Sequence, residues 1–267
     1  MTIPEFLYHY TTVESLAMIL STQSIRFSPL GKLDDRYEES TKEMFNPGRF
    51  IFISSWMGSE EESIPMWNQY SQMESGVRIK LPSLPFEQYQ VSNQEGGNFQ
   101  SVIPDKETYN SPWFLVNRRL ESSLIKVEYT NDEEKINPRL VFPKERSDED
   151  STNMVINFGI LGRYKKMCWS YQEEWRFRLM FIPVGYREMS RNQEIIGQIF
   201  WDRLHDLNYR LPFDYYFLKL SEEALTEMEV TLSPKITEGN RVIVESLRDK
   251  YNPKMKIHNS NLQHDIR

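Results

Sequence analysis

The stretch Phe6-Leu7-Tyr8-His9-Tyr10-Thr11-Thr12 reads as a β-strand, because aromatic and β-branched residues dominate it. Successive side chains of a strand point to opposite faces, so His9 and Thr11 share one face and the two tyrosines share the other. The strand is therefore two-sided, with a polar pair on one face and rings on the other. This combination suits the binding of a nucleotide.

A helix is expected directly behind this strand, since apolar residues recur at helical spacing over residues 13–20. Thr11 and Glu14 match the capping-box pattern that begins many helices. Thr11 is therefore either the helix cap or a site residue. His9 is either a partly buried histidine with a satisfied hydrogen bond or a site residue.

The rest of the chain alternates between strand-like and helical patterns. Strands are expected at 25–28, 49–56, 76–81, 124–129, 174–182, 214–220 and 255–257, and helices at 64–73 and 237–250. Pro and Gly punctuate 82–110, which predicts a loop-rich insertion, and charges fill 131–153, which predicts an exposed connection. Together these patterns predict a single α+β domain over residues 1–267, with a largely antiparallel sheet and peripheral helices.

Composition narrows the functional classes. The net charge of -7 disfavours generic binding to a nucleic-acid backbone, although a local basic groove stays possible. The single cysteine, Cys168, leaves no disulfide framework and reads as a packed thiol between Met167 and Trp169. No apolar run approaches the ~20 residues of a membrane helix, and Glu5 stands where a signal peptide would carry positive charge. We therefore expect a cytoplasmic protein with no membrane partner.

Several common motifs are missing from the sequence. It contains no G-x-x-x-x-G-K-[ST] loop, no G-x-G-x-x-G fingerprint and no G-x-S-x-G elbow. The four histidines, His9, His205, His258 and His264, lie far apart and lack metal-ligand spacing. We expect no metal site.

A polar cluster, Gln172-Glu173-Glu174, stands at the start of the most regular strand pattern. By alternation Gln172 and Glu174 share a face and Glu173 faces away. A carboxylate at a strand end can meet a ligand while the strand holds it in place. The alternative interpretation is a solvated turn before the strand.

Several segments match one family in order and spacing. They are L-Y-H-Y-T-T at 7–12, I-R-F-S at 25–28, L-D-D-R-Y-E at 33–38, F-I-S-S at 52–55, M-W-N-Q-Y at 66–70, G-V-R-I-K-L at 76–81, W-S-Y-Q-E-E-W-R at 169–176, Y-F-L-K-L at 216–220, S-P-K-I at 233–236 and K-I-H at 256–258. Together they resemble a bacterial family of unknown function, domain of unknown function 2971, placed within the ADP-ribosyltransferase superfamily. The likeness spans nearly the whole chain.

The resemblance implies a split, mostly antiparallel sheet and an NAD-dependent ADP-ribosyltransferase. NAD would be the substrate, without a metal, and ADP-ribose would pass to a macromolecular acceptor, either protein or nucleic acid. A toxin in phage defence is the implied context. The alternatives are an NAD glycohydrolase and a non-catalytic module that binds a nucleotide or a partner on the same fold.

The resemblance also implies roles for individual residues. In similar enzymes a histidine near the first strand touches a ribose hydroxyl of NAD, and His9 matches this place, with Tyr10 and Thr11 beside it. A glutamate on a later strand holds the nicotinamide ribose, and Glu174 matches this catalytic role. Gln172, its neighbour on the same face, stands where the family usually has an acidic residue. The acceptor therefore stays undefined.

Further binding residues are expected around these. Ser54 follows an aromatic strand, as the serine of some toxin members does. Arg26 and Arg176 are expected near the pyrophosphate, because a guanidinium offers two parallel donors. Arg178 is a further candidate, with a solvent-facing strand position as the alternative. Tyr70 lies on a W-x-x-Y helix that is expected to pack against the core, with cleft lining as the alternative.

Overall fold

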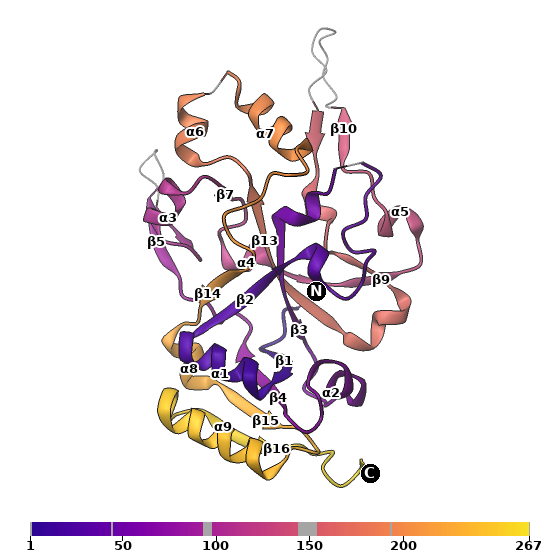
Figure 1. The fold of residues 1–267 in the computed structure, drawn as a ribbon, viewed down its shortest axis with the longest axis vertical. Helices are drawn as coiled ribbons and strands as arrows, with labels where there is room; N and C mark the ends of the chain where they lie inside the picture. The colour runs from indigo at the N-terminus through magenta and orange to yellow at the C-terminus, as the bar shows by residue number, and fades with distance from the viewer. Residues whose placement is uncertain (1, 44, 93–97, 144–153, 193, 267) are drawn as a thin grey trace.

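The computed structural model describes residues 2–43, 45–92, 98–143, 154–192 and 194–266, and a large sheet organises it (Figure 1). The main path of the sheet runs β14, β2, β3, β1, β4, β15, β16, while β13 pairs with β3 and also with β7 and β8. The bounds are β1 (Phe6–Thr12), β2 (Ser24–Pro29), β3 (Ile51–Met57), β4 (Gly76–Pro82), β7 (Phe114–Leu115), β8 (Leu124–Lys126), β13 (Glu174–Ile182), β14 (Tyr216–Lys219), β15 (Glu229–Leu232) and β16 (Lys256–Asn259). All pairs in this sheet are antiparallel except β15 with β16.

Three short ladders accompany the main sheet. They are β5 (Tyr89–Ser92) with β6 (Asn98–Ser101), β9 (Glu128–Thr130) with β12 (Tyr164–Lys166), and β10 (Val141–Pro143) with β11 (Met154–Ile156). The β9 and β12 strands run parallel, and they bring a lysine toward the start of β13. The expected mixed fold with a mainly antiparallel sheet is therefore confirmed.

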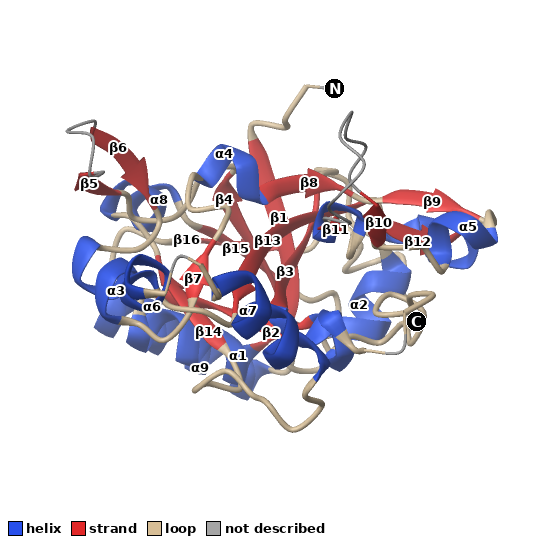
Figure 2. Ribbon diagram, turned by 90° about the horizontal axis from the view of Figure 1, so that it is seen from above, coloured by secondary structure: helices blue, strands red, loops and turns tan. Residues whose placement is uncertain are grey.

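The helices lie around this sheet (Figure 2). Their bounds are α1 (Val13–Thr22), α2 (Ile64–Tyr70), α3 (Asp105–Asn110), α4 (Leu120–Ser123), α5 (Glu133–Ile136), α6 (Tyr186–Arg191), α7 (Ile196–His205), α8 (Glu222–Glu227) and α9 (Glu238–Tyr251). Short 3-10 helices are η1 (Leu30–Lys32), η2 (Pro47–Phe50), η3 (Phe158–Ile160) and η4 (Met167–Gln172). The first and last helices, α1 and α9, lie side by side (Figure 1).

The sheet splits along one edge of β3. Its other edge pairs with β13 throughout, from Ile51 to Met57. On the splitting edge, β2 pairs with β3 only at residues 52–53 and β1 pairs only at Met57. Residues 54–56 have no ladder partner there, because β1 and β2 diverge. The split leaves a polar stretch of backbone and side chains open toward the space between the two strands.

The two faces of β1 belong to different apolar clusters. Leu7 packs in the largest core cluster, whereas Tyr8 and Tyr10 pack with Met57 and Trp67 in a separate one. The alternation predicted for this strand is therefore confirmed. Thr11 is not the helix cap: α1 begins at Val13, and the side chain of Thr12 accepts a hydrogen bond from the Ser15 N–H at 3.2 Å. The capping pattern is offset by one residue, because β1 continues through Thr12.

Most expected elements are present with bounds shifted by one to three residues, and the strand expected at 124–129 divides into β8 and β9. The segment 82–110 contains β5, β6 and α3, and its residues 93–97 lie outside the described residues. An exposed connection was predicted over 131–153, and this prediction was wrong for Ile136 and Leu140, which are buried. Their apolar side chains anchor the segment to the core. Its residues 144–153 lie outside the described part. Among the described helices, none combines the length and apolar character needed to cross a bilayer.

Candidate functional site

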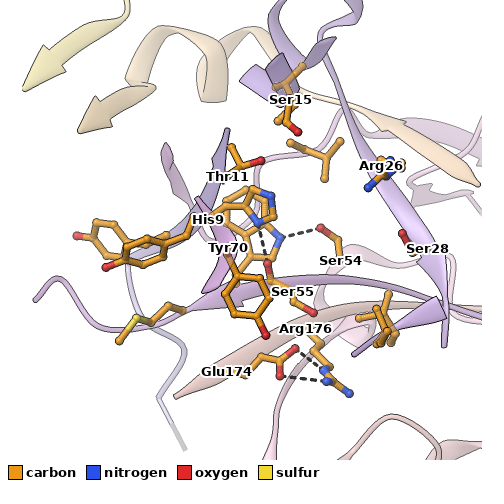
Figure 3. Close-up of a pocket in the computed structure, with 18 of the residues that line it drawn as sticks. His9, Thr11, Ser15, Arg26, Ser28, Ser54, Ser55, Tyr70, Glu174 and Arg176 are labelled. Atoms are coloured by element: carbon orange, nitrogen blue, oxygen red, sulfur yellow. Dashed lines mark hydrogen bonds and ion pairs between the residues drawn. The ribbon is translucent and has the colours of Figure 1, made fainter. Parts of the chain in front are cut away.

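The split of the sheet opens onto a cavity of about 610 Å³, which lies between β1, β2, β3, α1 and the start of β13 (Figure 3). This volume is in the range of small-molecule sites, ~300–1,000 Å³. All eight residues predicted from the sequence line it: His9, Tyr10, Thr11, Arg26, Ser54, Gln172, Glu174 and Arg176. Arg26 and Ser15 lie toward one end of the cavity, and Glu174 and Arg176 lie toward the other (Figure 3).

His9 presents a hydrogen-bond acceptor to the cavity. Its Nδ1 lies 2.9 Å from the Ser55 carbonyl oxygen, which can only accept, so Nδ1 carries the proton. Burial lowers the pKa of His9, and the charge of Arg26 lowers it further, although the hydrogen bond to Ser55 opposes both. The imidazole is therefore neutral near pH 7, with Nε2 unprotonated. The ring also packs 5.1 Å from the ring of Trp56, which fixes its orientation.

The lowered pKa of His9 predicts a loss of stability on acidification. Below the ordinary histidine pKa of about 6.5, His9 is protonated in the unfolded chain but still neutral in the folded chain. The free energy of unfolding therefore falls by up to about 1.4 kcal/mol for each pH unit of acidification. The loss continues until the pH reaches the lowered folded pKa. We expect His9→Gln to flatten this slope in urea unfolding between pH 7.5 and 5.5. The exposed His264, changed to Gln, is the matched control and should leave the slope in place.

Glu174 and Arg176 form a buried two-point ion pair at the deep end of the cavity (Figure 3). The Arg176 Nε donates to Glu174 Oε1 at 2.6 Å, and Nη2 donates to Oε2 at 3.0 Å. Both residues lie on β13 and are separated by one position, so they share a face of the strand. The Arg176 Nη1 also donates to the Gly162 carbonyl at 3.0 Å, which leaves the guanidinium no freedom to move.

Glu38 and Lys165 complete a network of four buried charges. Arg176 Nη1 donates to Glu38 Oε2. Lys165 Nζ lies 2.9 Å from Glu174 Oε2 and 3.2 Å from Glu38 Oε1. Each of the four side chains is buried, and two carboxylates balance two cations. The network therefore carries no net charge and joins β13, β12 and the segment after η1.

This environment keeps Glu174 ionised. Burial alone would raise the pKa of Glu174, but the charges of Arg176 and Lys165 outweigh burial and lower it to about 2. Arg176 and Lys165 occupy three acceptor positions of the carboxylate, out of about four. The Ser55 side chain contributes a further hydrogen bond that lowers the pKa of Glu174, so a ligand hydroxyl would replace Ser55 at the fourth position. A carboxylate of this pKa is a weak base, which argues against a role in deprotonating an acceptor.

Gln172 and Glu174 are both directed at Lys165. The amide oxygen of Gln172 accepts from Lys165 Nζ at 2.7 Å, and its Nε2 donates to the Tyr70 hydroxyl at 2.6 Å. Gln172 lies in η4 rather than in the strand, and Glu173, with φ of 43°, turns the chain between them. Burial raises the pKa of Tyr70, and Asp34 raises it further, so the hydroxyl stays protonated. Tyr70 lines the cavity, whereas Trp67 is core.

Three of the predicted binding residues contribute mainly to the wall of the cavity. The Tyr10 hydroxyl accepts from the Ser63 N–H at 2.9 Å. The Ser54 hydroxyl accepts from Trp56 Nε1 at 3.0 Å. Thr11 is buried on β1. Tyr10 and Ser54 are therefore already engaged within the protein, and they shape the cavity more than they offer free groups.

The predicted roles of two arginines were wrong. Arg176 is held between Glu38 and Glu174, so it is not available for a pyrophosphate. Arg178 neither lines the cavity nor faces solvent, since its Nη1 donates to the carbonyls of Gly159 at 2.7 Å and Leu161 at 2.9 Å. Both arginines are held in this way because residues 159–162 cover this face of β13, and their carbonyls accept from the two guanidinium groups.

Cys168 is exposed, so the expectation of a packed thiol was wrong. Its neighbour Met167 is also exposed and Trp169 is half-buried, because η4 turns this apolar-looking stretch outward.

Sequence reasoning missed Glu38 and Lys165. Glu38 was present in the L-D-D-R-Y-E segment, but no periodicity marks its side chain as buried. Lys165 lies on the three-residue strand β12, and only its parallel pairing with β9 brings it to Glu174. Among the described residues, the His, Cys, Asp and Glu side chains form no group of three or more that could hold a metal ion.

The family model described as "Protein of unknown function (DUF2971)" matches residues 66–177, which include most of α2, all of η4 and the first part of β13. This match supports the resemblance to that family. It covers Tyr70, Lys165, Gln172, Glu174 and Arg176. No curated protein and no solved structure matches the chain.

Proposed function

We propose that the cavity binds NAD and that the protein transfers ADP-ribose from NAD to a macromolecular acceptor. The observation that carries this proposal is the placement of two groups around one cavity: the bare Nε2 of His9 on β1 and the ionised carboxylate of Glu174 on β13. Both are hydrogen-bond acceptors. Each of the two riboses of a dinucleotide carries hydroxyl groups that can donate hydrogen bonds to these acceptors.

The cavity chemistry fits the breaking of the nicotinamide–ribose bond. When this bond breaks, nicotinamide leaves with the bonding electron pair and positive charge develops on the ribose. The Glu174 carboxylate, held in place by Arg176 and Lys165, would accept a hydrogen bond from a ribose hydroxyl and stabilise this charge. The acceptor then forms a bond to the ribose carbon and releases its proton to water, since Glu174 is too weak a base to take it.

One observation favours a second candidate, a binding module without turnover. The four buried charges compensate each other, so Glu174 offers less electrostatic stabilisation to a cationic transition state than an unpaired carboxylate would. Such a network also rigidifies a binding pocket. The same cavity would then recognise a nucleotide without cleaving it. Hydrolysis of NAD by water, with no macromolecular acceptor, is the intermediate possibility.

Incubation with NAD labelled in the adenosine part separates these functions. We expect free nicotinamide to accumulate and label to appear on a macromolecule from a bacterial lysate, because cleavage and transfer are coupled. Nicotinamide without label transfer would identify a glycohydrolase. Binding measured by calorimetry with no nicotinamide release would identify the module, and absence of binding would contradict the proposal altogether.

A further inference from the structure

Two cations and two exposed rings gather at the end of the cavity away from Glu174. We propose that this end, formed by β2, β14 and η1, is a subsite for a nucleoside diphosphate. Arg26 and Lys32 hold the diphosphate there, and Phe217 supports the base. The inference rests on the proposed function in taking a nucleotide as the occupant of the cavity, but it does not require that the nucleotide be cleaved.

The pairing of β2 with β14 places the base and phosphate groups side by side. Arg26 lies directly opposite Phe217 in this antiparallel ladder, so the two side chains share one face of the sheet. Both line the cavity, as does Lys32 from the adjoining turn η1. The three side chains come from separate elements and converge on one end of the same space.

The two cations share a single aromatic ring. The Arg26 Cζ lies 4.8 Å from the centroid of the Tyr215 ring, and the Lys32 Nζ lies 4.4 Å from it. Within the described ranges, neither forms an ion pair with a carboxylate within 4 Å. Both positive charges therefore lie beside one ring, and a bound diphosphate would accept hydrogen bonds from both groups.

Exposed apolar surface adjoins these cations. Phe217 is 53% exposed and Met18, on α1, is 61% exposed, and both line the cavity. A large apolar side chain that is half exposed at the mouth of a cavity is suited to stacking against a ligand ring. A purine next to a diphosphate would cover Phe217 while its phosphates reach Arg26.

The surrounding charges favour a small nucleotide over a nucleic-acid strand. Glu14, Asp34 and Glu174 also line the cavity, and the chain has a net charge of -7. A polyanion that extended beyond the two cations would meet these carboxylates and the overall negative field. A diphosphate matches the two cations without reaching further.

Equilibrium binding of ADP, adenosine and ADP-ribose to the full chain tests the subsite. We expect Arg26→Gln and Lys32→Gln each to lower the affinity for ADP and for ADP-ribose about tenfold or more, since each removes a charge-assisted hydrogen bond. Phe217→Ser should lower the affinity for all three ligands, adenosine included. All three side chains are exposed, so the variants keep the buried core. Lys219→Gln, which removes a charge from β14 outside the cavity lining, is the matched control and should bind as the wild type does.

Two outcomes would overturn the inference. One is wild-type affinity for ADP in both cation variants, or no ADP binding by the wild type. The other is an affinity for a single-stranded oligonucleotide that depends on Arg26 and Lys32 while ADP does not compete, which would assign the surface to nucleic acid. ADP binding that depends on these residues, without nicotinamide release from NAD, would support the subsite and contradict the transferase.

Discussion

Replacing Arg176 by methionine is expected to lower the free energy of unfolding by about 3–5 kcal/mol, the largest effect on stability that we predict. The reason is that Arg176 is fully buried and contacts two carboxylates, Glu38 and Glu174. Without the guanidinium, Lys165 alone faces both of them, and one negative charge stays buried without compensation. Urea unfolding at pH 7 measures the change directly.

The ion pair between Arg163 and Glu128 provides the control. Its side chains are 51% and 38% exposed, so Arg163→Met should lower the free energy of unfolding by less than about 1 kcal/mol. Adding Glu38→Gln, Glu174→Gln and Lys165→Met to the Arg176 variant should recover much of its loss, because no uncompensated charge then remains. Equal effects of the Arg176 and Arg163 changes would show that the buried network does not support the fold.

Glu174→Gln is expected to lower the rate of nicotinamide release by roughly a hundredfold or more, the largest effect on activity that we predict. The amide keeps the size of the side chain but removes the negative charge that faces the developing positive charge on the ribose. The variant also leaves Arg176 and Lys165 with only Glu38 as counter-charge. Rates should therefore be compared at a temperature at which circular dichroism shows both proteins folded.

The neighbouring residue supplies a control for the Glu174 variant. Glu173 is exposed and lies on the turn before β13, so Glu173→Gln makes the same chemical change outside the cavity and should keep the wild-type rate. If the protein acts as a toxin, growth arrest on induced expression should follow the same order, lost with Glu174→Gln and retained with Glu173→Gln. Full nicotinamide release by Glu174→Gln would remove this residue from the proposed reaction.

The sequence predicted the elements of the site better than their contacts. The strand at 6–12 and the strand at 174–182 carry regular alternation, so His9 and Glu174 could be assigned to particular faces. Both do line one cavity. The alternation also separated Tyr8 and Tyr10 from Leu7, as the two apolar clusters show.

The burial of charges could not be predicted in the same way. Glu38 lies in a segment with no repeating pattern, and Lys165 lies on a strand too short to show one. Both side chains are buried only because their segments pack against β13 in the folded protein, and a local sequence pattern does not show such packing. The assignment of Arg176 to a phosphate was wrong for the same reason. Its strand face was predicted correctly, but Glu38, which contacts its guanidinium, lies far away in the sequence.

The split beside β3 has a consequence for how the protein is made. His9 donates to Ser55 at the open edge of β3, and the Glu174 end of the cavity exists only where β13 pairs with that strand's other edge. During synthesis the amino-terminal strands emerge long before β13. A nascent chain that stops short of β13 therefore lacks the complete site, so any activity of this protein would begin only after most of its length has been translated and folded.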